Sequence, residues 1–188
     1  MIYRYSAAAV IGIALLLYFW IQPMSSKPDY QTVFDSSLTT SARLKWPVVK
    51  KGVRWKFPKV KHISTDSLAG LLSQPNQDPL LLDVRGIEEY EVSHLAGALK
   101  SESLEEALPI LQDVDTDRDI VLYCSVGYRS SELAGQLIDR GFNNVYNLEG
   151  GLFTWANEGK PVTGDGKVHP FSARWGTLLD EKVRAEEY

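Results

Sequence analysis

The sequence predicts an α/β fold in which a central parallel sheet is flanked by helices. Three short segments, at residues 80–82, 120–123 and 145–148, are rich in the apolar, β-branched and aromatic residues typical of strands. The first is an unbroken apolar run, which indicates a strand buried on both faces. Segments with the apolar spacing of helices alternate with these strands, and that alternation is typical of parallel α/β sheets.

The composition indicates one globular domain with additions at its ends. The chain has 188 residues, of which 44% are hydrophobic and 23% are charged. Its single cysteine, Cys124, excludes an internal disulfide and a cysteine-cluster metal site. His62, His94 and His169 are scattered along the sequence, so no metal ligand is predicted.

Residues 1–22 predict a membrane anchor. Residues 5–21 are uncharged, at the short end of the length that spans a bilayer as a helix. No convincing pair of small residues for signal-peptide cleavage follows them, so we expect a retained, single-pass helix. The nearest charges, Arg4 before the helix and Lys27 after it, favour placement of the domain on the extracytoplasmic side.

Residues 23–60 predict a tether that ends in a basic arm with interleaved aromatic residues. Eight Lys or Arg and no acid occur from residue 43 to residue 61, and counting them would favour the cytoplasmic side instead. Pro47 and Pro58 argue against a helix here. We expect either a solvated linker or an arm on a lipid surface or on the acidic side of the domain. A net charge of −4 and the lack of a nucleic-acid motif predict no nucleic-acid partner.

The predicted domain, residues 61–162, begins with a helix. Ser64 can cap this helix, whose apolar residues are Leu68, Leu71 and Leu72, and Pro75 marks its end.

Asp83 and Arg85 follow the first predicted strand, at the edge of the sheet where ligands bind in α/β folds. We nonetheless predict that both are structural. A buried pair of Arg85 with Asp83 or with Glu89, which fixes the loops, is the commoner use of such groups.

Further helices are predicted at residues 104–111 and 130–140. The first has Glu105 and Glu106 near its start, where negative charge is favourable, and Gly141 suits the end of the second. A last helical turn should carry Trp155. Residues 163–188 are predicted to pack back on the domain, with a place at the mouth of the active site as the alternative.

Cys124 is the candidate nucleophile because it lies between a predicted strand and a predicted helix. Gly127 permits unusual backbone angles, so successive amides of the connecting loop can turn toward the sulfur. Those amides and the start of a helix stabilise an anion, and they therefore favour the thiolate, the nucleophilic form of the thiol. The alternative is that Cys124 is a small buried hydrophobe.

The loop resembles the active-site loop of the rhodanese sulfurtransferases, whose pattern Cys-x-x-Gly-x-Arg-Ser is matched from Cys124 to Ser130. Leu82-Asp83-Val84-Arg85, with His94-Leu95-Ala96-Gly97-Ala98, is similar to two further motifs of that family, although Ser93 stands where glycine is usual. Residues 148–152 with Trp155 resemble its closing motif. The resemblance covers residues 61–162. It implies a rhodanese-like parallel sheet preceded by the predicted anchor.

The resemblance also implies a membrane-anchored sulfurtransferase. Cys124 would take a sulfane sulfur from a small anionic donor such as thiosulfate, carry it as a persulfide, and pass it to a thiol or cyanide-like acceptor. No metal or organic cofactor is implied. Arg129 suits an anionic donor. The implied substrate-binding residues are Ser125, Val126, Gly127, Tyr128, Arg129 and Ser130.

Two other functions are weighed against sulfur transfer. In a membrane-tethered binding module the cysteine would be idle and the fold would recognise a protein partner. In a cysteine phosphatase, the family resemblance implies that arginine stands six positions after cysteine, whereas Arg129 stands five positions after Cys124.

Overall fold

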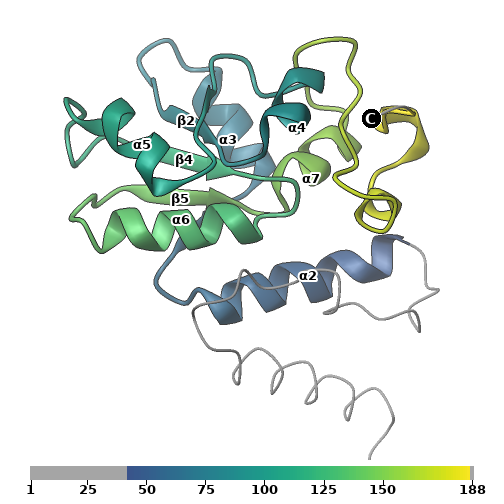
Figure 1. The fold of residues 1–188 in the computed structure, drawn as a ribbon, viewed down its shortest axis with the longest axis horizontal. Coiled ribbons are helices and arrows are strands. Elements are labelled where there is room, and N and C mark those ends of the chain that lie inside the picture. Colours follow the sequence, from purple (N-terminus) through teal and green to yellow (C-terminus); the bar gives the residue numbers. More distant parts are fainter. Residues whose placement is uncertain (1–41, 187–188) are drawn as a thin grey trace, which may run out of the picture. The chain divides into compact units, whose positions relative to one another are not determined.

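The computed structural model describes residues 42–186, which form a five-stranded parallel sheet with helices on both faces (Figure 1). The strand order is β1-β5-β4-β2-β3, and every pair of neighbouring strands is parallel. The strands are β1 (Lys61–Ile63), β2 (Leu80–Asp83), β3 (Leu99–Lys100), β4 (Ile120–Tyr123) and β5 (Val145–Leu148). The predicted α/β fold with a central parallel sheet is therefore confirmed.

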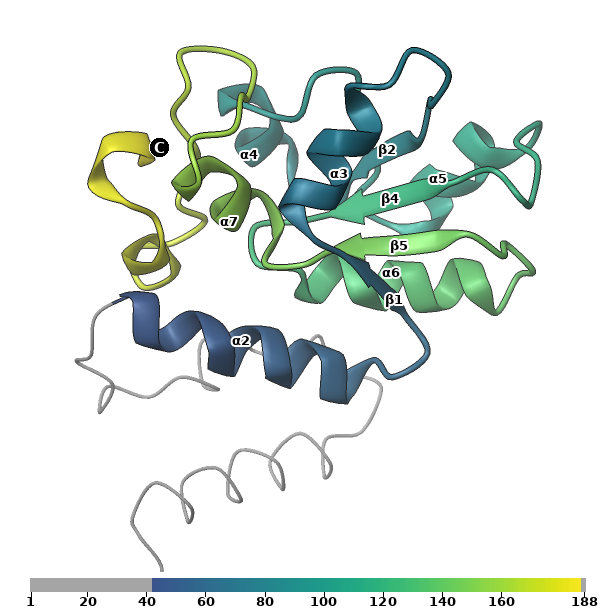
Figure 2. The same ribbon diagram turned by 180° about the vertical axis from the view of Figure 1, so that it is seen from behind.

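Helices α5 (Leu104–Leu111) and α6 (Tyr128–Ile138) cover one face of the sheet, and α3 (Thr65–Leu72) and α7 (Gly151–Asn157) cover the other (Figures 1 and 2). The core beneath α5 and α6 contains Leu82, Leu122, Leu133 and Leu137, all of them buried. Short α4 (Ile87–Val92) follows β2. The predicted cap of α3 is present, because the Ser64 side chain accepts a hydrogen bond from the Ser67 amide.

The basic arm forms a helix, α2 (Ala42–Lys56), so the prediction that proline prevents a helix there is wrong. Pro47 lies inside this helix and is exposed. It removes one backbone donor, but Val49 and Val53, four residues apart, are buried on the side that faces the domain. Apolar packing therefore offsets the proline. Pro58 follows the end of the helix, where proline is expected.

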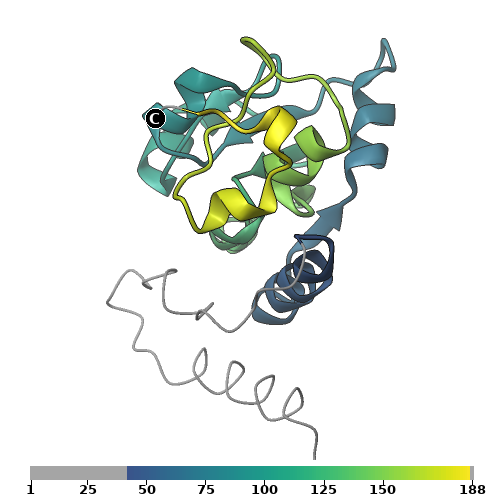
Figure 3. The same ribbon diagram turned by 90° about the vertical axis from the view of Figure 1, so that its right-hand side faces the viewer.

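The C-terminal residues pack on the domain beside α7 (Figure 3). They contain two short 3-10 helices, η1 (Trp175–Leu178) and η2 (Glu181–Val183). The Asn157 side chain donates to the Leu178 carbonyl at 2.7 Å and accepts from the Asp180 amide at 2.8 Å. The predicted packing of this segment on the domain is thus seen for residues 163–186.

The predicted anchor, residues 1–22, and the first half of the tether, residues 23–41, lie outside the described residues. Within residues 42–186, none of the helices combines the length and the apolar composition that a membrane span needs.

Candidate active site

Cys124 lies at the C-terminal edge of the sheet, directly after its central strand. All four residues of β4 are buried, and β4 pairs with β5 on one side and β2 on the other. This is the edge at which α/β folds bind ligands. Only 1% of the Cys124 surface is exposed, so the sulfur is enclosed by its own loop and its neighbours.

The loop after Cys124 turns an amide toward the sulfur. Gly127 has a φ of 96°, which a side chain would disfavour, and its N–H donates to Cys124 Sγ at 3.2 Å. Helix α6 begins at the next residue, and Ser131 Oγ donates to the Gly127 carbonyl at 2.7 Å. The sulfur therefore receives a backbone donor at the start of a helix, an arrangement that stabilises a thiolate.

The turn between β5 and α7 supports the loop from behind. The amides of Leu152 and Phe153 donate to the carbonyls of Cys124 and Ser125 at 2.8 and 3.0 Å. A Cβ at Gly151 would lie 2.2 Å from the Cys124 carbonyl oxygen, so this close approach requires glycine. Residues that follow a different strand thus fix the backbone of the reactive loop.

Arg129 is held by a buried carboxylate behind the loop. Its two terminal nitrogens donate to the two oxygens of Glu89 at 2.8 and 3.0 Å, and one of them also donates to Ser125 Oγ at 3.0 Å. Ser125 Oγ donates to Glu89 at 2.6 Å. The ring of Phe171 lies 4.7 Å from the Arg129 guanidinium. Arg129, which was predicted to bind an anionic donor, is therefore neutralised by Glu89 within the protein. Glu89 was predicted from the sequence as a partner of Arg85.

Burial favours the neutral form of both partners, but their mutual attraction outweighs it. For Arg129, burial alone would lower the pKa, and the nearby Cys124 sulfur and Glu89 raise it above its usual value. For Glu89, burial would raise the pKa, and the hydrogen bonds and charge of Arg129 lower it. Both groups therefore stay charged at neutral pH.

Asp83 and Arg85 form a buried ion pair next to the site. Arg85 donates through Nη2 to Asp83 Oδ2 at 2.7 Å and through Nε to Asp83 Oδ1 at 2.9 Å, and both side chains are fully buried. Arg85 also donates to the Ser93 carbonyl at 2.5 Å. The pair ties the end of β2 to the loop after α4, which is a structural role.

Tyr128 and Ser130 contact other parts of the domain. Tyr128 packs edge-on against Phe57, with ring centroids 5.1 Å apart, and Val126 is buried. Ser130 Oγ donates to Asn147 Oδ1 at 2.6 Å. Of the predicted substrate-binding residues, the structure gathers Ser125, Gly127 and Arg129 around Cys124.

Asn147 and His62 form a chain of contacts that the sequence did not predict. The Asn147 amide nitrogen lies 3.1 Å from His62 Nδ1, so the amide of Asn147 links His62 to Ser130. Burial, and then the charge of Arg54, lowers the pKa of His62, while Glu149 opposes this shift. The neutral imidazole is favoured. Because β1 and β5 are neighbours with His62 opposite Asn147, only the strand pairing could have revealed the contact.

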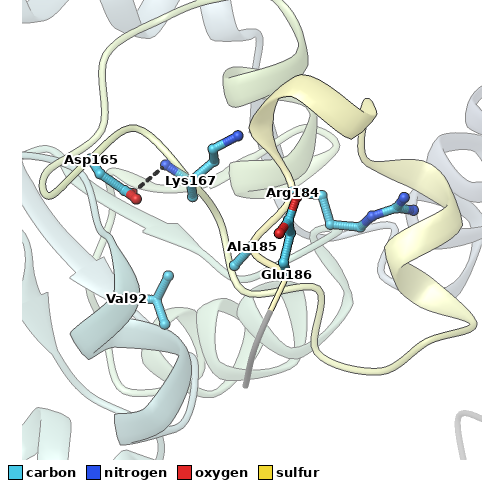
Figure 4. A pocket seen from close by; sticks show the side chains of 6 residues that line it. All are labelled: Val92, Asp165, Lys167, Arg184, Ala185 and Glu186. Atoms are coloured by element: carbon cyan, nitrogen blue, oxygen red, sulfur yellow. Dashed lines mark hydrogen bonds between the residues drawn. The ribbon is translucent and has the colours of Figure 1, made fainter.

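A separate hollow of about 490 Å³ lies between the end of α4 and the C-terminal segment. Its lining combines acids and bases, and the Asp165 carboxylate accepts from the Lys167 amide at 2.9 Å (Figure 4). Lys167 Nζ donates to the Lys182 carbonyl at 2.9 Å. The lining residues are Val92, Asp165, Lys167, Arg184, Ala185 and Glu186. None of them is a predicted site residue. In the described part of the chain, no three His, Cys, Asp or Glu residues come together as a metal site.

Comparison with known proteins gives the rhodanese-like family that the loop motif resembled, but the similar proteins are named for a different reaction from the one predicted. The model of the rhodanese-like domain family matches residues 64–158. A tRNA uridine(34) hydroxylase of Photorhabdus laumondii is 34% identical over 119 residues, which are 58% of this chain and 34% of that protein. A protein of the same name from Yersinia pestis is 32% identical over 133 residues, covering 66% of this chain and 37% of the relative. The chain thus spans about a third of the length of these relatives.

A solved structure agrees in fold. The Alr3790 protein from Anabaena sp. is 27% identical, with a TM-score of 0.50, and the match covers 54% of this chain and 81% of that one.

The relatives contradict the predicted function and one predicted partner class. Their names describe hydroxylation of a tRNA uridine, so the prediction of a membrane-anchored enzyme that moves sulfur from thiosulfate to a small acceptor is wrong. The prediction that no nucleic acid is a partner is wrong on the same finding. The loop pattern indicates a nucleophilic sulfur but does not specify the molecule attacked. The net charge of −4 is also a poor guide to nucleic-acid binding, because it combines the basic residues 43–61 with an acidic remainder of the chain.

Proposed function

Because the chain belongs to the rhodanese-like domain family, we propose that it is a cysteine-dependent enzyme that modifies a uridine of tRNA, and that the modification is hydroxylation. One observation carries the proposal: Cys124 has the surroundings of a reactive thiol in a chain whose curated relatives are named for this reaction. A uridine in a single-stranded loop can be splayed out of the stack and brought to a buried group.

The chemistry that suits Cys124 is addition to the uracil ring. The thiolate forms an Sγ–C6 bond, and the electrons of the C5–C6 double bond move onto C5 and its neighbouring carbonyl. C5 then takes the distal oxygen of a peroxide-class oxidant, the O–O bond breaks, and an alcohol or water leaves. Loss of the C5 proton expels the thiolate and breaks the Sγ–C6 bond. The sum is uridine plus peroxide giving hydroxyuridine plus alcohol or water.

Other residues of the site have supporting tasks in this scheme. The Gly127 amide, which donates to Sγ at 3.2 Å, stabilises the thiolate before it attacks and after it leaves. Glu89 and Ser125 hold Arg129 in place. Because this ion pair already neutralises its charge, Arg129 orders the loop and does not bind a separate donor.

The test uses an unmodified tRNA transcript, the full chain, and aerobic buffer with and without an added peroxide. The tRNA is then digested to nucleosides, which are separated by chromatography and analysed by mass spectrometry. We expect the target uridine to gain the mass of one oxygen with the wild-type chain and to stay unchanged with Cys124→Ser. Lys182→Gln, an exposed change in η2, serves as the control and should retain activity.

Two results would contradict the proposal. Full hydroxylation by Cys124→Ser would mean that the cysteine takes no part. A product uridine in which sulfur replaces oxygen would show that the reaction is sulfur transfer, the activity that the resemblance of the Cys124 loop implied.

A further inference from the structure

Helix α2 presents a basic and aromatic outer face to solvent. Trp55 and Val48 are 47% and 52% exposed, and Lys51 and Lys56 are exposed as well. At 100° per residue, Val48 and Trp55 lie between the two lysines around the helix. We call Val48, Lys51, Trp55 and Lys56 the outer face of α2.

The opposite side of α2 holds the helix next to the reactive loop. Val49 and Val53 are buried there, and Arg54 Nε donates to Glu149 at 2.6 Å. The Lys50 side chain reaches Gly150, where a Cβ would lie 2.9 Å from Lys50 Cε. Glu149 and Gly150 directly precede Gly151, which touches the Cys124 carbonyl. A ligand on the outer face would therefore lie near the end of the sheet that carries the sulfur.

Charge separates α2 and β1 from the rest of the domain. Residues 46–65 contain six Lys or Arg and no acid, whereas residues 66–186 contain ten Lys or Arg against 21 acids. A polyanion approaching the domain would be attracted to the α2 side and repelled by most of the remaining surface.

We propose that the outer face of α2 binds the phosphate backbone of the tRNA, with Trp55 as a stacking surface for an unpaired base. The proposal rests on the proposed function and adds a substrate-docking element that precedes the family match at residues 64–158. Lysines beside an exposed aromatic ring are the chemistry that holds single-stranded nucleic acid, because phosphates pair with Lys and bases stack on aromatic rings.

A lipid surface fits α2 less well. A helix that lies in a membrane interface buries its apolar face among the lipids. The apolar face of α2, formed by Val49 and Val53, is already packed on the protein. The outer face carries two lysines, one aromatic ring and one valine.

The experiment measures tRNA binding by the full chain with Cys124→Ser in the background, so that affinity is read without turnover. Fluorescently labelled tRNA transcript is titrated at several salt concentrations. For Lys51→Gln with Lys56→Gln, we expect a three- to tenfold weaker Kd at low salt. The slope of log affinity against log salt should shrink by about 1.4–1.8, since each phosphate contact contributes roughly 0.7–0.9.

Two further variants define the result. Lys100→Gln with Arg118→Gln removes the same charge from the end of β3 and from the segment just before β4, and its affinity should stay within about twofold of the parent. Trp55→Ala should weaken binding by at least about fivefold with little change in the salt slope, because stacking on an aromatic ring does not release counterions.

The outcomes separate docking from chemistry. Equal Kd and equal salt slope for the α2 double variant and its charge-matched control would overturn the docking face, even if the wild-type chain hydroxylates tRNA. Loss of sedimentation with anionic phosphatidylserine vesicles, with tRNA affinity unchanged, would overturn it in favour of a membrane face. Docking through α2 without any uridine product would leave the docking face standing and contradict the proposed function.

Discussion

At the scale of single residues, Glu89 organises the site as much as Cys124 does. Its carboxylate is almost completely buried, it accepts two hydrogen bonds from Arg129, and it accepts a third from Ser125. A buried guanidinium needs such a partner, because an unpaired charge in the interior is costly. Glu89 therefore positions the loop from a helix that precedes it by some 40 residues.

Glu89→Ala should destabilise the fold by about 3–5 kcal/mol, because it leaves the Arg129 charge buried without its counterion. Glu89→Gln keeps one acceptor and should cost less. Urea unfolding followed by tryptophan fluorescence gives both values. Glu88→Ala is the matched control, since Glu88 is an exposed neighbour, and its effect should stay within about 0.5 kcal/mol. An Ala variant at residue 89 as stable as this control would remove the role assigned to the ion pair.

The sequence predicted the residues of the site that are neighbours along the chain. Cys124, Gly127 and the start of α6 follow one another, so strand and helix patterns were sufficient to place them. The contacts of Arg129 with Glu89, of Asn147 with His62, and of Phe171 with Arg129 join residues that are far apart in sequence. Local periodicity contains no information about which distant side chain neutralises a buried charge.

At the scale of helices and strands, the length of a strand decides whether the sequence could predict it. Strands β2, β4 and β5 were found from their apolar runs, but β1 and β3 have only three and two residues, too few to show a pattern. Helix α2 was not predicted because Pro47 and Pro58 argue against a helix, and the structure shows that Val49 and Val53 are buried against the domain. One lost backbone hydrogen bond is a smaller term than two buried side chains and the ion pair of Arg54 with Glu149.

Val49→Ala should lower the free energy of unfolding by about 1–3 kcal/mol, since Val49 is 4% exposed and truncation leaves a cavity between α2 and the domain. Its neighbour Val48 is 52% exposed, and Val48→Ala should change stability by less than about 0.5 kcal/mol. Limited proteolysis should cut first within α2 in the Val49 variant. If both variants unfold alike, α2 is not docked through this side.

At the scale of the whole molecule, several buried groups make the fold acid-sensitive. Burial lowers the pKa of His62 and His169 below their usual 6.5, and the interaction with Arg129 lowers that of Glu89 below its usual 4.5. For each group the unfolded chain binds protons more readily than the folded chain does. The stability that these groups contribute is therefore complete above their usual pKa values and is lost as the pH falls below them. Glu132, whose pKa is raised by burial, opposes part of this loss.

We expect the free energy of unfolding to decline from about pH 7.5 to about pH 5.5 through the histidines, and to fall further below about pH 4.5 through Glu89. Denaturant titrations at a series of pH values measure this directly. His62→Gln should flatten the first part of the curve and leave the second part unchanged. A free energy of unfolding that stays constant from neutral pH to about pH 4 would contradict the expected acid sensitivity.

The hydrogen bonds that support the Cys124 loop come from residues later in the chain, so the loop can take its final shape only late in synthesis. Strand β1 pairs with β5, whose residues are made more than 80 positions later, and the carbonyls of Cys124 and Ser125 accept hydrogen bonds from Leu152 and Phe153. Because these contacts are distant in sequence, the ribosome releases the cysteine before the residues that hold its loop. A nascent chain that has emerged only to the end of α6 thus carries its single thiol on an unsupported turn. The emergence of α7 is the step that gives the reactive loop its final shape.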